Sequence, residues 1–160
     1  PRPVERTIAS IAEQVEAIDA IVDRARSRLR VFDVDLSQGG WHTADRAERL
    51  VAFLRRAHGP RVDVIVHDTR WLAQSCPRLI TVLRLYGHAI TVYRTGTEAR
   101  NAMDPLVIAD DRHYLHRFHV DGPRAALAFD SPIAARPLVA RFEEIWATGE
   151  PGLSATVLGL

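Results

Sequence analysis

Helix-like and strand-like patterns alternate along the first hundred residues, and this alternation limits the possible folds more than any other feature. Helical segments place apolar residues every three or four positions, and strand segments alternate or are rich in β-branched residues. In chain order the sequence predicts helix 7–28, strand 29–36, helix 44–57, strand 61–68, helix 75–87 and strand 89–94. Because strands separated by helices need crossover connections, we expect a parallel sheet with helices packed on it.

The pattern changes after residue 100. Three short apolar segments follow one another, at residues 105–110, 114–120 and 124–129. Asp110-Asp111 and Asp121-Gly122 supply the turn chemistry between them, which indicates an antiparallel meander. A last helix is expected to begin near Ser131 or at Pro137 and to end at Trp146, with an apolar tail that forms a strand or a docked arm. We expect one domain, residues 1–160, with its core at about 8–148 and a tail at 150–160.

Composition excludes several kinds of chemistry. All 21 basic residues are arginine, so reactions that need a lysine, such as Schiff-base formation, are excluded. The net charge of +1 gives no strong general attraction for nucleic acid, which is therefore not an expected partner. No stretch approaches the roughly 20 apolar residues that cross a bilayer, so no membrane contact is expected. With its single cysteine, the chain fits a cytoplasmic protein, and no cofactor is indicated.

Three histidines, His113, His116 and His119, recur at every third residue. On a helix, neighbouring members would lie close together, but the apolar alternation around them predicts a strand. On a strand only the first and third share a face, and they are too far apart to meet at one ion. We therefore expect partly exposed strand histidines and no metal site.

Cys76 stands at the predicted start of a helix, where the helix dipole favours a thiolate. A nucleophilic cysteine also needs a histidine in contact, and His67 at the end of the preceding strand is the candidate. The alternative, which we favour, is a buried structural cysteine.

Polar residues follow the predicted parallel strands where each strand ends. Ligands of open α/β sheets bind beyond the carboxyl ends of the strands, so these side chains predict a ligand cleft, with Arg70 near it. The residues expected to line the cleft are Asp35, His67, Asp68, Arg94 and Asp104. We find neither a glycine-rich phosphate loop nor a Gly-x-Ser-x-Gly nucleophile elbow.

This order of elements, ending in a hairpin and the helix "ARFEEIW", resembles the phospholipase D superfamily across residues 8–148. The chain looks especially like a bacterial branch in which the superfamily motif, His-x-Lys, four residues, then Asp, is degenerate. The motif falls on residues 103–110. Asp110 occupies the aspartate position, Met103 stands where the nucleophilic histidine belongs, and Pro105 stands where the lysine belongs.

The resemblance implies an α/β fold with a mixed sheet that is flanked by helices. Along the chain, parallel α-β units come first and an antiparallel hairpin follows them. It also implies a homodimer and a phosphate-containing ligand, with Arg94 as the anion contact. Because a thioether and a pyrrolidine ring cannot replace histidine and lysine, we expect a catalytically inactive binding or interaction module.

Two alternatives stay open. The first is an enzyme with a re-formed site, in which His67 and a nearby carboxylate, Asp68 or Asp35, hydrolyse a phosphodiester or a nucleotide. The second is a structural domain attached to a catalytic domain of a longer protein.

Overall fold

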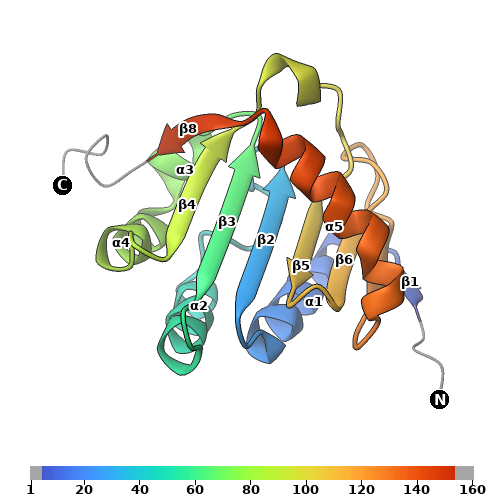
Figure 1. Cartoon of the computed structure of the whole chain (residues 1–160), viewed down its shortest axis with the longest axis horizontal. Helices are drawn as coiled ribbons and strands as arrows, with labels where there is room; N and C mark the ends of the chain where they lie inside the picture. The colour runs from blue at the N-terminus through green and yellow to red at the C-terminus, as the bar shows by residue number, and fades with distance from the viewer. Residues whose placement is uncertain (1–4, 154–160) are drawn as a thin grey trace.

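The computed structural model describes residues 5–153, which form one eight-stranded mixed sheet with helices on both faces (Figure 1). The strands lie in the order β1-β7-β6-β5-β2-β3-β4-β8. The three parallel strands at its centre are β2 (Arg28–Asp33), β3 (Arg61–Val66) and β4 (Ile90–Arg94). They finish at one end of the sheet, so side chains that follow them gather there.

The antiparallel part of the sheet extends the parallel strands on the β2 side. It consists of β5 (Leu106–Ala109), β6 (His113–Arg117) and β7 (Ala125–Ala128). The edge strands are β1 (Arg6–Ile8), which pairs with β7, and β8 (Glu150–Leu153), which pairs with β4. This mixed sheet is the fold expected from the order of elements.

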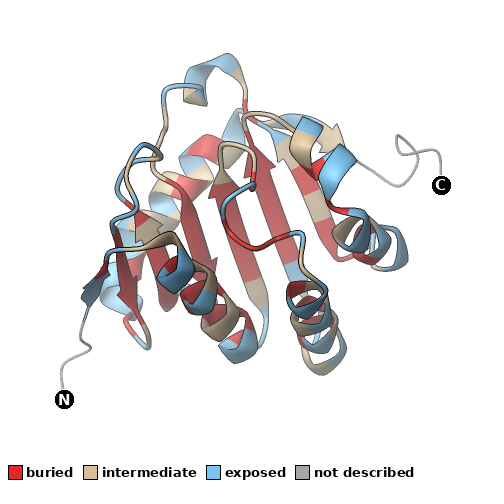
Figure 2. Ribbon diagram, turned by 180° about the vertical axis from the view of Figure 1, so that it is seen from behind, coloured by how far each residue is buried: buried red, intermediate tan, exposed pale blue. Residues whose placement is uncertain are grey.

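Four helices cover one face of the sheet, and a single helix crosses the other diagonally (Figures 1 and 2). The four are α1 (Ile11–Arg24), α2 (Ala44–Arg56), α3 (Arg70–Ser75) and α4 (Pro77–Leu85). The single helix is α5 (Pro132–Ala147), and a short 3-10 turn, η1 (Thr97–Ala99), follows β4. None of the helices within residues 5–153 has the length and apolarity that a bilayer span needs.

The sequence placed most elements within a few residues, but it missed two short ones, β1 and α3. Residues 6–8 form β1 and not the start of a helix, because the Ser10 side chain accepts the Glu13 N–H at 3.1 Å and so caps α1. The helix expected at 75–87 is α4, and a further short helix, α3, which was not expected, precedes it. Pro77 lacks an N–H and begins α4 anew. The expected tail strand is β8, four residues long, and residues 154–160 lie outside the described part.

The two faces of the sheet have separate apolar cores. Alternate residues of β2 show the division, because Leu29 and Val31 face α1 and α2 whereas Phe32 faces α5. On the α5 side, Phe142 and Ile145 pack over the sheet, as their helical spacing predicted. Figure 2 shows the central strands buried along most of their length.

Candidate functional site

The degenerate motif is divided between the two ends of β5. Met103 and Pro105 precede β5 at the end of the sheet where β2, β3 and β4 finish, since Leu106 pairs with Phe32. Asp110 follows β5 at the opposite end, where its N–H bonds the Arg28 carbonyl at 2.9 Å. The motif aspartate therefore cannot share a cleft with the other two positions.

Asp110 clamps the loop that leads into β2. Its carboxylate accepts the backbone N–H groups of Arg26, Ser27 and Arg28 at 2.8, 2.9 and 3.0 Å, and the Ser27 hydroxyl at 2.9 Å. Burial alone would raise the pKa of this carboxyl, but the donated hydrogen bonds outweigh burial and lower it. The residue has a structural role at this position.

Pro105 lines a small cavity at the other end of β5, against the ends of β2 and β6. Its volume is about 20 Å³, which is room for about one water molecule. The polar groups that reach the cavity are Gln14, Asp33, Gln38 and Arg117. In this conformation the cavity cannot hold a phosphodiester.

Asp33 is the half-buried carboxyl of this cavity. Burial raises its pKa to about 6, the Val34 N–H at 2.6 Å acts in the opposite direction, and the nearby charge of Asp35 adds to the rise. Arg117 attracts the carboxylate, but its donors already serve the carbonyls of Gly122 and Val120 and the Gln38 side chain at 2.6–2.8 Å. Asp33 is therefore a weak acid compared with the other aspartates of this end.

Asp104 is held on the α5 face of the sheet by two partners that the sequence did not suggest. His116 Nε2 lies 2.8 Å from its carboxylate, and Arg141 of α5 forms a two-bond pair at 2.5 and 2.8 Å. Burial opposes ionisation, but these two partners lower the pKa of Asp104 to about 2. The hairpin register, in which Leu106 pairs with His116, was the available signal for the histidine contact.

His67 has both ring nitrogens occupied. Nδ1 lies 2.6 Å from the Thr95 hydroxyl, and Nε2 lies 2.6 Å from the Ala102 carbonyl oxygen. A carbonyl can only accept, so Nε2 carries the hydrogen and Thr95 donates to Nδ1. Through these two contacts the ring ties β3 to the segment that joins β4 to β5.

The other residues of the predicted cleft are each bonded locally. Asp35 accepts the Ser37 N–H at 2.9 Å, Asp68 pairs with Arg70 at 2.6 Å, and Arg94 pairs with Glu150 at 3.1 Å. Arg70 lowers the pKa of Asp68 to about 2. No hydrogen bond or ion pair within residues 5–153 joins any two of the predicted cleft residues, so a shared ligand site there stays a prediction.

The three evenly spaced histidines have separate partners. His113 accepts the Asp130 N–H at 3.0 Å, and His119 accepts the Asp121 N–H at 3.1 Å, whereas His116 contacts Asp104. Across residues 5–153, no three side chains of His, Cys, Asp or Glu converge in a way that could hold a metal ion.

Cys76 is the buried structural cysteine that was expected, and it lacks the surroundings of a nucleophile. Cys76 is fully buried, and burial raises the pKa of its thiol to about 11, so it is not a thiolate near neutral pH. His67 is bonded elsewhere and does not activate it.

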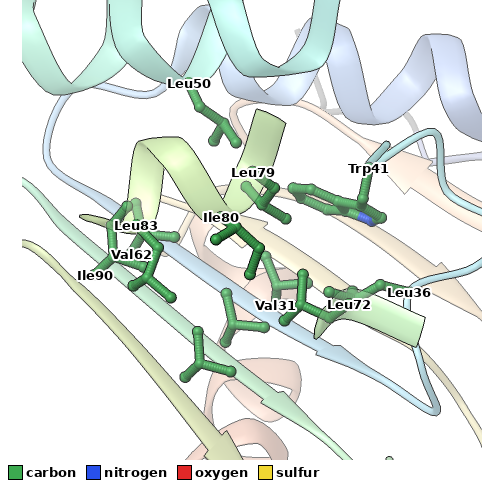
Figure 3. Close-up of a pocket in the computed structure, with 12 residues that line it drawn as sticks. Val31, Leu36, Trp41, Leu50, Val62, Leu72, Leu79, Ile80, Leu83 and Ile90 are labelled. Carbon is green, nitrogen blue, oxygen red and sulfur yellow. The ribbon is translucent and has the colours of Figure 1, made fainter. Parts of the chain in front are cut away.

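The main apolar core contains a second small cavity, between α2, α4 and the sheet (Figure 3). It also measures about 20 Å³. Leu50 and Leu79 line the cavity from the helices, and Val31 and Val62 line it from the sheet. Trp41 covers one side. A cavity this small and without polar lining groups is a packing defect and not a ligand site.

Comparison with known proteins identifies both family and fold. Residues 10–155 match the model of a family described as a domain of unknown function (DUF7931). No curated protein sequence matches the chain.

Solved structures are similar to the chain over nearly its whole length. Nuc, a phospholipase D family member from Salmonella typhimurium, superimposes with a TM-score of 0.67 at 16% identity, covering 96% of this chain and 100% of Nuc. NucT from Helicobacter pylori gives 0.64 at 14% identity, covering 94% and 100% of the two chains. The archaeal chromatin protein TrmBL2 gives 0.68 at 10% identity, covering 92% of this chain and 54% of its own. The chain therefore belongs to the DUF7931 family, and its fold is the phospholipase D fold that the order of its elements predicted.

Proposed function

We propose that this domain does not hydrolyse phosphodiesters by the histidine and lysine mechanism and that it serves as a binding or interaction module. The supporting observation is the closed end of β5, where Met103 and Pro105 take the two reactive positions. The cavity beside Pro105 has a volume of about 20 Å³. A phosphate group would have neither a nucleophile, nor a cation from these positions, nor enough room.

A re-formed enzyme is the second candidate, and the contact between Asp104 and His116 favours it. A carboxylate that holds one ring nitrogen leaves the other free to act as a base, and Nδ1 of His116 has no hydrogen-bond partner among residues 5–153. His67 suits this role less well because both of its nitrogens are bonded. Arg141 also neutralises Asp104, which weakens the carboxylate's support of a protonated His116.

Two further features of the proposal come from the resemblance. A homodimer would bring the two degenerate motifs together, and a phosphate-containing ligand would need an accessible cation. Arg94 is already paired with Glu150, so a ligand there would have to displace this carboxylate. The structural neighbour TrmBL2 binds DNA, which makes nucleic acid a partner class to test.

Hydrolysis assays test the proposal directly. Purified protein is incubated with bis(p-nitrophenyl) phosphate and with labelled single-stranded DNA, with an active phospholipase D-family nuclease as the positive control. We expect no product above the buffer blank. Product formation that follows the protein through purification and is lost in His116→Ala would support the re-formed enzyme instead. Loss in Met103→Ala would instead show that the degenerate motif itself is catalytic.

A further inference from the structure

Arginine side chains gather at the end of the sheet opposite to the degenerate reactive positions. Here β2, β3 and β4 begin, α1, α2 and α4 end, and the turn from β5 to β6 lies beside them (lower edge in Figure 1). We call this end the arginine edge. Its basic residues are Arg24, Arg26, Arg55, Arg56, Arg61, Arg84 and Arg112.

Most of these arginines have no carboxylate partner. Within the described part of the chain, Arg24, Arg26, Arg55 and Arg84 form no ion pair, and all four are exposed. Arg56 differs because it donates to the last carbonyls of α1 and so joins α1 to α2. The three helix C-termini contribute about half a negative charge each, which is less than the four unpaired guanidinium groups supply.

The acidic residues of this end are mostly neutralised. Asp23 pairs with Arg49, Asp111 pairs with Arg30, and the carboxylate of Asp110 is taken up by backbone amides. Asp130 forms the loosest pair: its carboxylate is 70% exposed and lies 3.6 Å from the Arg112 guanidinium. The arginine edge therefore keeps a positive charge although the whole chain carries only +1.

An open hollow of about 590 Å³ lies within this edge. Three guanidinium groups line it, those of Arg24, Arg26 and Arg112, together with Ser27, His113 and the carboxylates of Asp23, Asp110 and Asp130. The first two carboxylates are already held by Arg49 and by backbone amides, so the guanidinium groups outnumber the one exposed carboxylate. The Arg24 guanidinium lies 3.9 Å from the centre of the Phe129 ring, which holds that cation in place beside the hollow. Guanidinium groups offer paired donors that match the oxygens of a phosphate.

We propose that the arginine edge binds the phosphodiester backbone of nucleic acid, with the hollow at Arg24, Arg26 and Arg112 as its central contact. The inference deepens the proposed function, because it names the partner class of a module that binds without cleaving. The arginine edge lies at the end of the sheet away from Met103 and Pro105. Nucleic-acid binding at this edge and the loss of hydrolysis at the motif can therefore be refuted separately.

The arrangement favours a linear polyanion over a membrane or a small anion. The arginines continue from the end of α1 past α2 to α4, across neighbouring strands about 4.8 Å apart, so one extended chain of phosphates can reach several of them. A flat membrane would not follow the hollow. The two large exposed apolar residues at this end lie on opposite faces of the sheet and form no common patch. Leu85 of α4 lies beside Val51 and Val82, and Ile133 lies on α5.

Fluorescence anisotropy with a labelled 20-nucleotide single strand and the matching duplex tests the proposal, over a series of salt concentrations. We expect binding that does not depend on sequence and weakens steeply with salt. Replacing both Arg24 and Arg26 with Gln should raise Kd about tenfold or more at low salt. The log–log salt slope should become shallower by about 1.4–1.8, because two phosphate contacts are lost.

Two further variants make the experiment specific. Asp130→Asn should tighten binding, since it removes the exposed carboxylate that pairs with Arg112 at the hollow and so frees this arginine for a phosphate. Arg124→Gln is the matched control and should leave Kd unchanged, because this exposed arginine precedes β7 at the opposite end of the sheet. Circular dichroism checks that each variant is folded.

Several results would overturn the inference. One is the absence of binding to either DNA at low salt. Another is binding that Arg124→Gln abolishes but the double variant does not. The third is binding to acidic phospholipid vesicles without binding to DNA. Cleavage of the labelled DNA, seen on a gel, would overturn the proposed function while leaving the arginine edge intact.

Discussion

Asp33 provides the sharpest test of the site electrostatics. In the variant Asp33→Asn, the side-chain oxygen can still accept the Val34 N–H, and only the ability to ionise is lost. The folded pKa is about 6 against an ordinary value of 3.8, a difference of roughly two units. Each unit corresponds to about 1.4 kcal/mol, so ionising Asp33 in the folded protein costs up to about 3 kcal/mol.

The direction of the pH dependence follows from the raised pKa. Asp33 binds its proton more tightly in the folded than in the unfolded state, so its favourable contribution is complete below about pH 4. This contribution is lost as the pH rises through 6. The asparagine resembles the protonated acid at every pH. We therefore expect the variant to equal the parent near pH 4 and to be more stable at pH 8, by up to about 3 kcal/mol.

Urea unfolding of parent and variant at one-unit steps from pH 4 to pH 8 measures this difference. Asp68→Asn serves as the comparison, because Arg70 lowers the pKa of that carboxyl to about 2 and so its stabilising effect is lost only as the pH falls below 4. A difference between Asp33→Asn and the parent that stays constant with pH would refute the reasoning. So would a variant that is less stable at pH 8, since either result would mean that Asp33 is ionised and favourably paired in the folded protein.

Three other predictions concern the structural roles assigned above. Asp110→Ala should lower the free energy of unfolding by about 2–4 kcal/mol, because three backbone N–H groups and the Ser27 hydroxyl lose a charged acceptor; an unchanged urea midpoint would contradict the clamp. Leu50→Ala, at a 2% exposed position beside the core cavity, should cost about 2–5 kcal/mol, whereas Leu85→Ala at 65% exposure should stay within about 0.5 kcal/mol. Cys76 should resist a disulfide reagent at pH 8 in the native protein and react once urea unfolds the chain; rapid native labelling would show that the thiol is accessible.

The order of the elements could be predicted from the sequence because long segments with a clear period carry their own signal. Helices α1 and α2 belong to this group. Strands β2 to β7 have only four to six residues but stand out as apolar runs between turn residues. The elements β1, β8 and α3, of three to six residues, show neither a clear period nor an apolar run. Their conformation depends on partners in the fold, as when β1 pairs with β7.

The contacts of the candidate site could be predicted only in part. The ends of the predicted strands show which residues lie at the same end of the sheet, but they do not show which side chains are in contact. The sequence could place Met103, Pro105 and Asp110 around one strand. It could not show that Arg141 reaches Asp104, because this contact depends on the angle at which α5 crosses the sheet. It also could not show that His67 bonds inward to Thr95 and Ala102.

The Asp110 clamp also bears on how long the folded domain persists. It joins residues up to 84 positions apart along the chain, so its bonds form only after β5 has settled beside β2. Interactions that form after the folding barrier slow unfolding without speeding folding. The variant Asp110→Ala should therefore unfold at least several-fold faster than the parent in stopped-flow experiments. Its refolding rate should stay close to that of the parent. By this reasoning, the one motif residue that stays in place sets the lifetime of the folded state.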